Sequence, residues 1–302
     1  RGHVMAGWAF ARGRASLDTG WRFGEPTRRT TVEAYVNRME DIGPIQGVSG
    51  AFNSLSAITG SADYLDPYFT SGIGIRQEIS FDSRVRLEAA GRWERHRAGR
   101  NEVDDDPGGG LGPVLPIAEG DRWQGSVAVR WDDQRSLELG LTGTLASHAG
   151  TGFGTLDADV EWRRDWRERG TTLEGSVSGR LSSTGVPPQG LSLLGGRSTL
   201  PGVPYRAYAG DAFWLAGIVG SQTLFHPWVR LRVLASAGQT AFLSGEQPED
   251  WLGLDATAAR ASVGAGVSLA WDVVRIDVAR GLGGGGEWDL ILSVDQRFWP
   301  WL

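Results

Sequence analysis

The stretch LDADVEWRRDWR, residues 156–167, contains the pattern that decides the fold. From Leu156 to Trp162 every second residue is apolar, and the residues between them are acidic. A two-residue period places the two kinds of side chain on opposite faces of a β-strand. Arg164 interrupts the apolar face near its end, where a long side chain can reach an interface with water. The stretch therefore predicts a strand with one apolar face and one charged face.

The same alternation recurs along most of the chain. The further segments are Ser16 to Gly24, Val85 to Glu94, Trp123 to Asp132, Leu137 to Leu145, Leu173 to Leu181, Ser262 to Trp271, Val274 to Ala279 and Trp288 to Trp299. Runs of about ten residues are longer than the usual strands of soluble proteins and match a tilted strand that crosses a bilayer. Tryptophan lies near many of the strand ends, as in the aromatic girdles of membrane barrels.

An open sheet edge would leave backbone groups unsatisfied in lipid, so membrane-spanning strands must close into a barrel. At about 20 residues for each strand with its connection, the chain has room for roughly 15 strands, and bacterial barrels favour even numbers. The pattern predicts an all-β fold, a transmembrane antiparallel β-barrel of about 12 to 16 strands with a polar lumen. The alternative is a soluble β-sandwich or soluble barrel, in which one face of each strand is buried and the other is solvated.

The connections between these segments fall into two kinds. Short ones are Asp82-Ser83, Asp132 to Arg135 and Arg169-Gly170, and long polar ones are Gly43 to Leu65, Ala98 to Asp121, Ser182 to Tyr205 and Ser244 to Ala256. Short turns at one end and long loops at the other are typical of outer-membrane barrels. Because no repeat or linker interrupts the pattern, we expect residues 1–302 to form a single outer-membrane β-barrel domain.

Composition excludes several other classes of protein. The 45 glycines among 302 residues disfavour a mostly helical chain, since glycine weakens helix interiors. Absence of cysteine rules out disulfides, thiolate metal sites and a cysteine nucleophile. The net charge of −6 shows no basic excess, so no nucleic acid is expected as a partner. Two stretches without charge, residues 42–62 and 212–229, contain too many Gly, Ser and Thr residues for a membrane helix.

No motif in the chain predicts catalysis. The sequence has four histidines but no GxSxG elbow, HExxH motif or EF-hand loop, and no pair of nucleophile and base. We therefore expect neither an enzyme nor a cofactor, and no metal. The acidic triplet Asp104 to Asp106 has two interpretations, a cation site or a solvated loop tip, and the second is favoured.

The charged strand faces are expected to line the lumen. Glu94 belongs to one such face, and those singled out as lumenal are Asp157, Asp159, Glu161, Arg163 and Arg180. Because the two signs are mixed, we favour cross-bracing of the interior over a pore that selects by charge, in which one sign more often dominates. A passive or gated porin stays open as the alternative.

The closing third of the chain resembles the bacterial surface-antigen superfamily of outer-membrane barrels, which includes BamA and TamA. The resemblance rests on the segments SVGAGVSLAW (262–271), VRIDVAR (274–280) and LILSVDQRF (290–298). The last segment also fits the C-terminal signal read by the outer-membrane assembly machinery, with five residues on one face: Leu290, Leu292, Val294, Gln296 and Phe298. Asp295 departs from the Gly usual in the family, and Trp299 to Leu302 extend past its terminal Phe.

The family also has a loop that folds back into the lumen and sets an Arg against acidic residues. The segment LGGRSTLPGVPYRAY (194–208) is similar to it, with Gly195 and Gly196 at its start and Arg206 and Tyr208 at its tip. Ala207 stands where Gly is usual, and Ser236 and Gln222 occupy positions that are acidic in the family. We predict that Arg206 is buried in the lumen and paired, with Asp211, Asp159 or Glu161 as replacement partners.

What the resemblance implies for function is a role in assembling, inserting or translocating proteins at the bacterial outer membrane. The implied partners are outer-membrane lipids and lipopolysaccharide, the assembly machinery and substrate polypeptides. The chain begins at Arg1 without a basic and apolar leader, so a signal peptide and any periplasmic domains are expected to lie outside it. Besides a porin, a membrane anchor for such an N-terminal domain is a further alternative.

Overall fold

The computed structural model describes residues 2–9, 14–43, 67–99, 115–245, 254–270 and 272–294. These residues are almost entirely β, with two single-turn 3-10 helices at Arg167–Arg169 and Pro188–Gly190. None of the described residues forms a helix that is long and apolar enough to span a bilayer. The strands are β1 (Gly2–Ala9), β2 (Arg14–Glu25), β3 (Arg28–Asp41), β4 (Pro67–Ser80), β5 (Val85–Ala98), β6 (Gly120–Asp132), β7 (Leu137–His148), β8 (Thr151–Trp166), β9 (Thr171–Ser182), β10 (Ser192–Leu194), β11 (Tyr208–Gly210), β12 (Ala212–Phe225), β13 (Val229–Ala241), β14 (Arg260–Leu269), β15 (Val274–Leu282) and β16 (Trp288–Val294).

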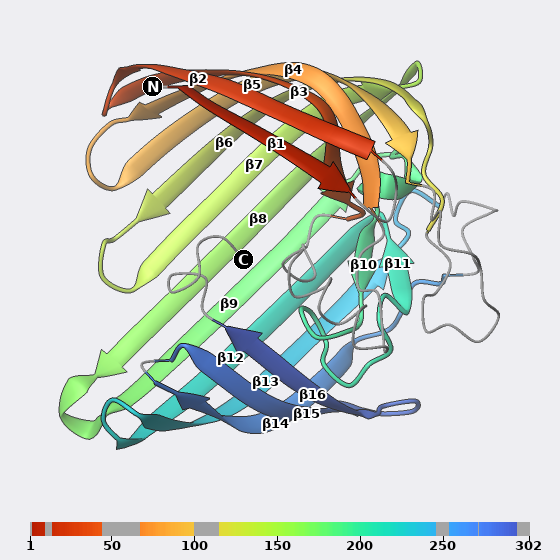
Figure 1. Ribbon diagram of the computed structural model, residues 1–302. Coiled ribbons are helices and arrows are strands. Elements are labelled where there is room, and N and C mark those ends of the chain that lie inside the picture. Colours follow the sequence, from red (N-terminus) through yellow and green to blue (C-terminus); the bar gives the residue numbers. More distant parts are fainter. Residues whose placement is uncertain are drawn as a thin grey trace.

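Fourteen of these strands form one antiparallel sheet that curls round a central space (Figure 1). Each strand pairs with its neighbour in sequence, except that β9 pairs with β12 because β10 and β11 form a separate two-stranded sheet. The number of strands lies within the predicted range, and the all-β barrel prediction is confirmed. Within the described residues, no ladder joins β1 to β16.

The two faces of the sheet differ as the alternation predicts. On β8, Leu156 and Val160 are 46% and 37% exposed, and on β9 the neighbouring Val177 and Leu181 are also exposed. Asp157, between the first two, faces the opposite side and pairs with Arg180 across the ladder. Exposed apolar side chains occur on nearly every strand of the large sheet. A continuous apolar outer face with charges inside is the arrangement of a barrel in lipid.

The connections divide between the two ends of the sheet. At one end, the short-turn end, the links are residues 26–27, 81–84, 133–136, 167–170, 226–228 and 270–273. At the other, the long-loop end, they are residues 42–66, 99–119, 149–150, 183–211, 242–259 and 283–287. The predicted asymmetry is therefore confirmed, and the long-loop end corresponds to the extracellular side of outer-membrane barrels.

Simple alternation did not predict every strand. The segments that it identified leave out β1, β3, β4, β12 and β13. On β1 nearly every residue is apolar or small, and the apolar faces of the other four contain Thr, Ser, Gly or Gln. A bulge also interrupts β3 where its register against β4 shifts between Tyr35 and Arg38. An extra residue in one strand reverses the faces beyond it. Tyr35 therefore faces the lumen at an odd-numbered position, and Arg38 faces it at an even one.

Candidate functional site: a loop folded into the lumen

The connection from β9 to β12, residues 183–211, lies inside the sheet at the long-loop end (Figure 1). It includes β10 and β11, and the runs 191–196, 199–203 and 209–211 are buried. Loops of ordinary barrels run over the surface and are exposed. Here Leu194 and Leu200 are fully buried in a small core with Val203 and Phe213. We call residues 183–211 the lumen loop.

Glycine makes the sharp turn of the lumen loop possible. Gly195 has φ +117°, and a Cβ atom there would lie 2.2 Å from the carbonyl oxygen of Pro204. The backbone closes this turn with a bond from the Gly196 amide to the Val203 carbonyl. Only a residue without a side chain adopts this conformation at such close approach. The structure thus gives a physical reason for the two glycines, Gly195 and Gly196, that were singled out in the sequence.

Arg206 is buried and paired, but its partner differs from those predicted. Its guanidinium donates to the Asp41 carboxylate at 2.6 Å and to the Ile42 carbonyl at 3.3 Å, at the end of β3. Asp211 instead accepts bonds from the Leu243 and Ser244 amides. The expected partners are closer in the sequence: Asp211 ends the lumen loop itself, and Asp159 and Glu161 are on β8. Asp41 lies 165 positions away, and only the curvature of the whole sheet brings it near.

Tyr208, the other predicted tip residue, belongs to β11 and does not accompany Arg206. It pairs with Leu194 in the small sheet, and the Arg260 guanidinium lies 5.5 Å from its ring centroid. The aromatic ring beside Arg206 is that of Tyr205, with a corresponding distance of 5.0 Å. The tip of the lumen loop therefore consists of Tyr205 and Arg206.

The far side of the lumen loop contacts the last two strands. The Glu287 amide donates to the Gly202 carbonyl at 2.7 Å, and Arg197 donates to Asp289 on β16 at 3.1 Å. With Arg206 bound at β3, the lumen loop joins early strands of the sheet to late ones across the lumen. The main structural property of the site is that one loop contacts both β3 and the last two strands.

A second polar anchor holds the start of the lumen loop. The Gln189 side chain exchanges two hydrogen bonds with the backbone of Ala118, 3.0 Å from the amide and 2.9 Å to the carbonyl. This pair fixes the orientation of the amide group, so its NH₂ also faces Nδ1 of His96 at 3.2 Å. His96 Nδ1 then accepts, and Nε2 carries the proton that is directed at Glu94, 3.3 Å away. The lumen loop thereby sets the tautomer of a buried histidine.

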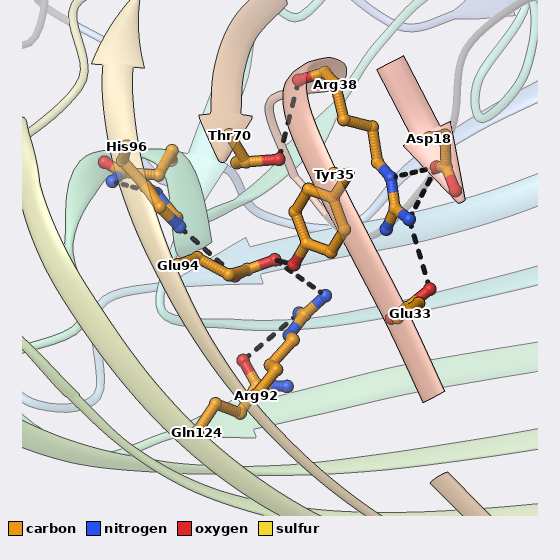
Figure 2. Close-up of polar contacts among 10 residues, drawn as sticks. Asp18, Glu33, Tyr35, Arg38, Thr70, Arg92, Glu94, His96 and Gln124 are labelled. Atoms are coloured by element: carbon orange, nitrogen blue, oxygen red, sulfur yellow. Dashed lines mark hydrogen bonds and ion pairs between the residues drawn. The ribbon is translucent and has the colours of Figure 1, made fainter. Parts of the chain in front are cut away.

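Glu94 is the centre of this polar cluster, shown in Figure 2. It is 2% exposed and accepts a hydrogen bond of 2.5 Å from the Tyr35 hydroxyl, and the Arg92 guanidinium lies 3.3 Å away. A buried carboxylate stays charged only when donors surround it, as they do here. Both carboxylate oxygens of Glu94 are engaged in this cluster, which links the lumen loop to β3 and β5.

Beyond Tyr35 the network reaches the first strands. The Arg38 guanidinium lies 3.6 Å from the Tyr35 ring centroid and binds Asp18 on β2 at 2.6 Å and Glu33 at 3.1 Å (Figure 2). The bulge in β3 makes this arrangement possible, because it turns both Tyr35 and Arg38 to the lumen. Sequence alternation could assign Glu94 to the lumen, but it contained no signal for the bulge or for the pairing of Gln189 with His96.

Below the lumen loop, toward the short-turn end, lies a cavity with a volume of about 880 Å³ that has both polar and apolar walls. Its wall includes Arg197 and Thr199 of the lumen loop together with Glu161, Arg163 and Glu174. Of the predicted lumenal charges, Arg163 binds Glu174 at 2.6 Å, and Asp157 binds Arg180 at 2.5 Å. Asp159 faces Gly140 on the neighbouring strand. Paired charges of both signs fit cross-bracing.

The predicted C-terminal signal lies only partly within the described residues. Leu290 and Leu292 on β16 are 58% and 44% exposed and share the outer face. Val294 ends the strand, whereas Gln296 and Phe298 lie outside the described residues, as does the acidic triplet at residues 104–106. Among the described residues, no three side chains of the metal-binding types are grouped so that they could hold a metal ion.

Comparison with known proteins places the fold. No protein-family model matches the chain, and no curated protein matches it in sequence. Among solved structures, a crystal structure of BamA from Haemophilus ducreyi lacking POTRA domains 1-3 matches with a TM-score of 0.57 and 11% identity, over 93% of this chain and 62% of that chain.

CdiB from Escherichia coli matches with a TM-score of 0.43 and 12% identity, over 97% of this chain and 60% of that chain. CdiB from Acinetobacter baumannii matches with a TM-score of 0.40 and 10% identity, over 96% of this chain and 57% of that chain. At such identities the likeness concerns the fold alone. The likeness to BamA shows that the chain has the fold of an outer-membrane β-barrel.

Proposed function

We propose that this barrel acts at the bacterial outer membrane in the assembly, insertion or translocation of proteins. The observation that carries the proposal is the lumen loop, whose Arg206 is bound to Asp41 inside the barrel at 2.6 Å. A loop held in this way by a buried ion pair is the feature that the sequence resemblance led us to expect. The chain also has a fold like that of BamA.

The contacts of the lumen loop suit a role in which the wall of the barrel takes part. Arg206 binds the end of β3, and Gly202 binds the link between β15 and β16. A loop tied to both groups of strands couples their positions. A protein that inserts or translocates polypeptides along its wall needs the early and late strands to move together, and an unobstructed lumen would not provide this.

The implied partners follow from this role. They are unfolded outer-membrane polypeptides as substrates, other components of the assembly machinery, and the lipids and lipopolysaccharide that surround the barrel. No nucleic acid is proposed as a partner. We also propose that the chain is not an enzyme, because the groups best suited to proton transfer, Glu94 and His96, are buried and engaged in holding the lumen loop.

The test uses proteoliposomes that contain the purified protein and, as a probe, a small outer-membrane barrel diluted from urea. The rate at which the probe acquires heat-resistant gel mobility is compared with the rate in empty liposomes. The wild-type protein should accelerate folding of the probe, and Arg206→Ala should lose most of that acceleration, while Arg206→Lys should retain part of it. Equal rates with and without the protein would overturn the proposal.

The matched control is Arg163→Ala, which removes a lumenal guanidinium that is half exposed and far from Asp41. It should leave the acceleration unchanged. A passive or gated porin is the second candidate, favoured by the cavity of about 880 Å³ below the lumen loop. Large, stable conductance steps of the wild-type protein in planar bilayers, without acceleration of probe folding, would favour the porin. Activity that requires an added N-terminal domain would favour the anchor.

A further inference from the structure

Two adjoining grooves mark the outer wall of the barrel across β2 to β7. The first has a volume of about 660 Å³ and is lined mainly by apolar side chains: Ile73, Ile75, Trp93, Trp123 and Leu145. The second, nearer the long-loop end, has a volume of about 420 Å³. Ile73 and Trp93 line both and separate them. We call them the apolar groove and the arginine groove.

The apolar groove exists because two glycines lie opposite each other. Gly91 on β5 pairs directly with Gly125 on β6, and the next outward-facing pair toward the long-loop end is Trp93 with Trp123. A Cβ atom on Gly125 would find no other atom within 4 Å, so open space lies above it. The surrounding Ile73 and Trp123 are 60% and 65% exposed. The wall is therefore recessed at the glycines and raised around them.

The arginine groove adds positive charge above the tryptophan pair. Arg95 and Arg97, the next outward residues of β5, both line it. Arg95 is bound bidentately to Asp121, at 2.7 and 3.1 Å, and the nearby Glu119 carboxylate accepts from the Ala98 amide. Arg97 is exposed. The groove thus offers one guanidinium held in place by a carboxylate and another directed at the surroundings.

We propose that these grooves form a binding site for one molecule of lipopolysaccharide, with an acyl chain in the apolar groove and a headgroup phosphate at Arg95 and Arg97. The outer wall of an outer-membrane barrel faces lipid, so the occupant of a groove there is an acyl chain. The long loops extend to the outside, so the two arginines lie at the level of the outer leaflet. Lipopolysaccharide carries several acyl chains and phosphate on one headgroup, which fits two adjacent grooves of unlike chemistry.

Selectivity should come from the headgroup. A lipid tail gains no hydrophobic free energy when it leaves other tails for an apolar groove, so its contribution is van der Waals packing alone. A phosphate bound by guanidinium groups gains charge-assisted and bidentate hydrogen bonds. The proposal concerns the outer wall and does not depend on what the lumen loop or the barrel does with polypeptides.

Native mass spectrometry can test the site. The folded protein is placed in detergent micelles doped with lipid A or, separately, with phosphatidylglycerol, and the fraction that retains lipid is measured. Lipid A should be retained more strongly than phosphatidylglycerol. Arg97→Gln should weaken retention of lipid A about tenfold, the effect of losing one good charge-assisted bond, and Gly125→Leu should weaken it by filling the groove.

Two variants serve as matched controls. Arg28→Gln removes an exposed outward arginine of β3 at the short-turn end, and Ala265→Leu fills an exposed outward position on β14. Both should retain lipid A as the wild type does, and heat-dependent gel mobility confirms that every variant is folded. If Arg97→Gln is unfolded, Arg97→Lys takes its place.

Equal retention of lipid A by Arg97→Gln and Arg28→Gln would overturn the headgroup site. Equal retention by Gly125→Leu and Ala265→Leu would overturn the acyl groove. Equal binding of lipid A and phosphatidylglycerol by the wild type would overturn the choice of lipid.

Discussion

Glu94, at the long-loop end of the lumen, and Glu174, nearer the short-turn end, both face an arginine, yet their side chains are 2% and 40% exposed. Glu94 has a tyrosine, a histidine and an arginine around it, and the lumen loop reaches this cluster through the bond from Gln189 to His96. Glu174 faces the cavity below the lumen loop and binds Arg163. A pair of glutamate and arginine should therefore contribute much more to stability where it is buried beside the lumen loop than where it is half exposed.

The largest difference in stability between the two ends should appear when each of these glutamates is replaced by alanine. Glu94→Ala leaves buried donors without their acceptor and should lower the free energy of unfolding by about 3 to 5 kcal/mol. Glu174→Ala removes one partner of a solvated pair and should cost about 0 to 1 kcal/mol, less at high salt. Guanidinium unfolding in detergent micelles measures both. Equal losses would mean that the lumen loop does not shield the cluster around Glu94.

A smaller difference in stability is expected when two glycines of similar backbone conformation are each replaced by alanine. Gly202 has φ +77° in the lumen loop, and a Cβ atom there would lie 2.3 Å from the Gly281 amide nitrogen. Gly245 has φ +73°, and a Cβ atom there would meet nothing within 4 Å.

Both alanine variants take on left-handed strain of about 1 to 2 kcal/mol, and Gly202→Ala should add about 1 to 3 kcal/mol for overpacking. The Gly202→Ala variant should also make the lumen loop accessible to limited proteolysis. Equal proteolysis of the two variants would show that Gly202 does not hold the lumen loop against β15 and β16.

The smallest effect concerns a turn outside the lumen. Hydrogen bonds from the Ser136, Leu137 and Arg135 amides hold the pKa of Asp133 well below its usual value. Because the folded-state pKa is lowered, the stabilisation is complete above the unfolded pKa and is lost as the pH falls through the folded one. The amide NMR shifts of Ser136 and Leu137 should therefore change only in strong acid. Asp133→Asn should remove that titration, and a change near the ordinary pKa of aspartate would contradict the assignment.

The sequence was sufficient for most strands of the large sheet but not for the pairing of the site. Alternation identified β8 and its neighbours because period-two patterning follows directly from a wall with two unlike faces. It placed Glu94 in the lumen for the same reason. The partner of Arg206 could not be found in this way, since Asp41 is 165 positions distant and its approach depends on the curvature of the whole sheet.

The bulge in β3 escaped prediction for a related reason. Asn37 has φ +50°, and its side chain donates to the Ala15 carbonyl on β2. Asparagine tolerates the left-handed conformation better than most residues, so it was a weak local signal. What fixes the bulge is the contact with β2, which no local pattern contains.

The lumen loop has a mechanical consequence for the whole wall. In a sheet where each strand touches only its neighbours, small changes of angle accumulate from strand to strand, so the slowest and largest motion is a uniform change of curvature. The bond from Arg206 to Asp41 and the bond from the Glu287 amide to the Gly202 carbonyl span that motion from β3 to the link before β16. These two bonds resist a change in the curvature of the whole sheet, and they leave the ladder between any two adjacent strands unchanged.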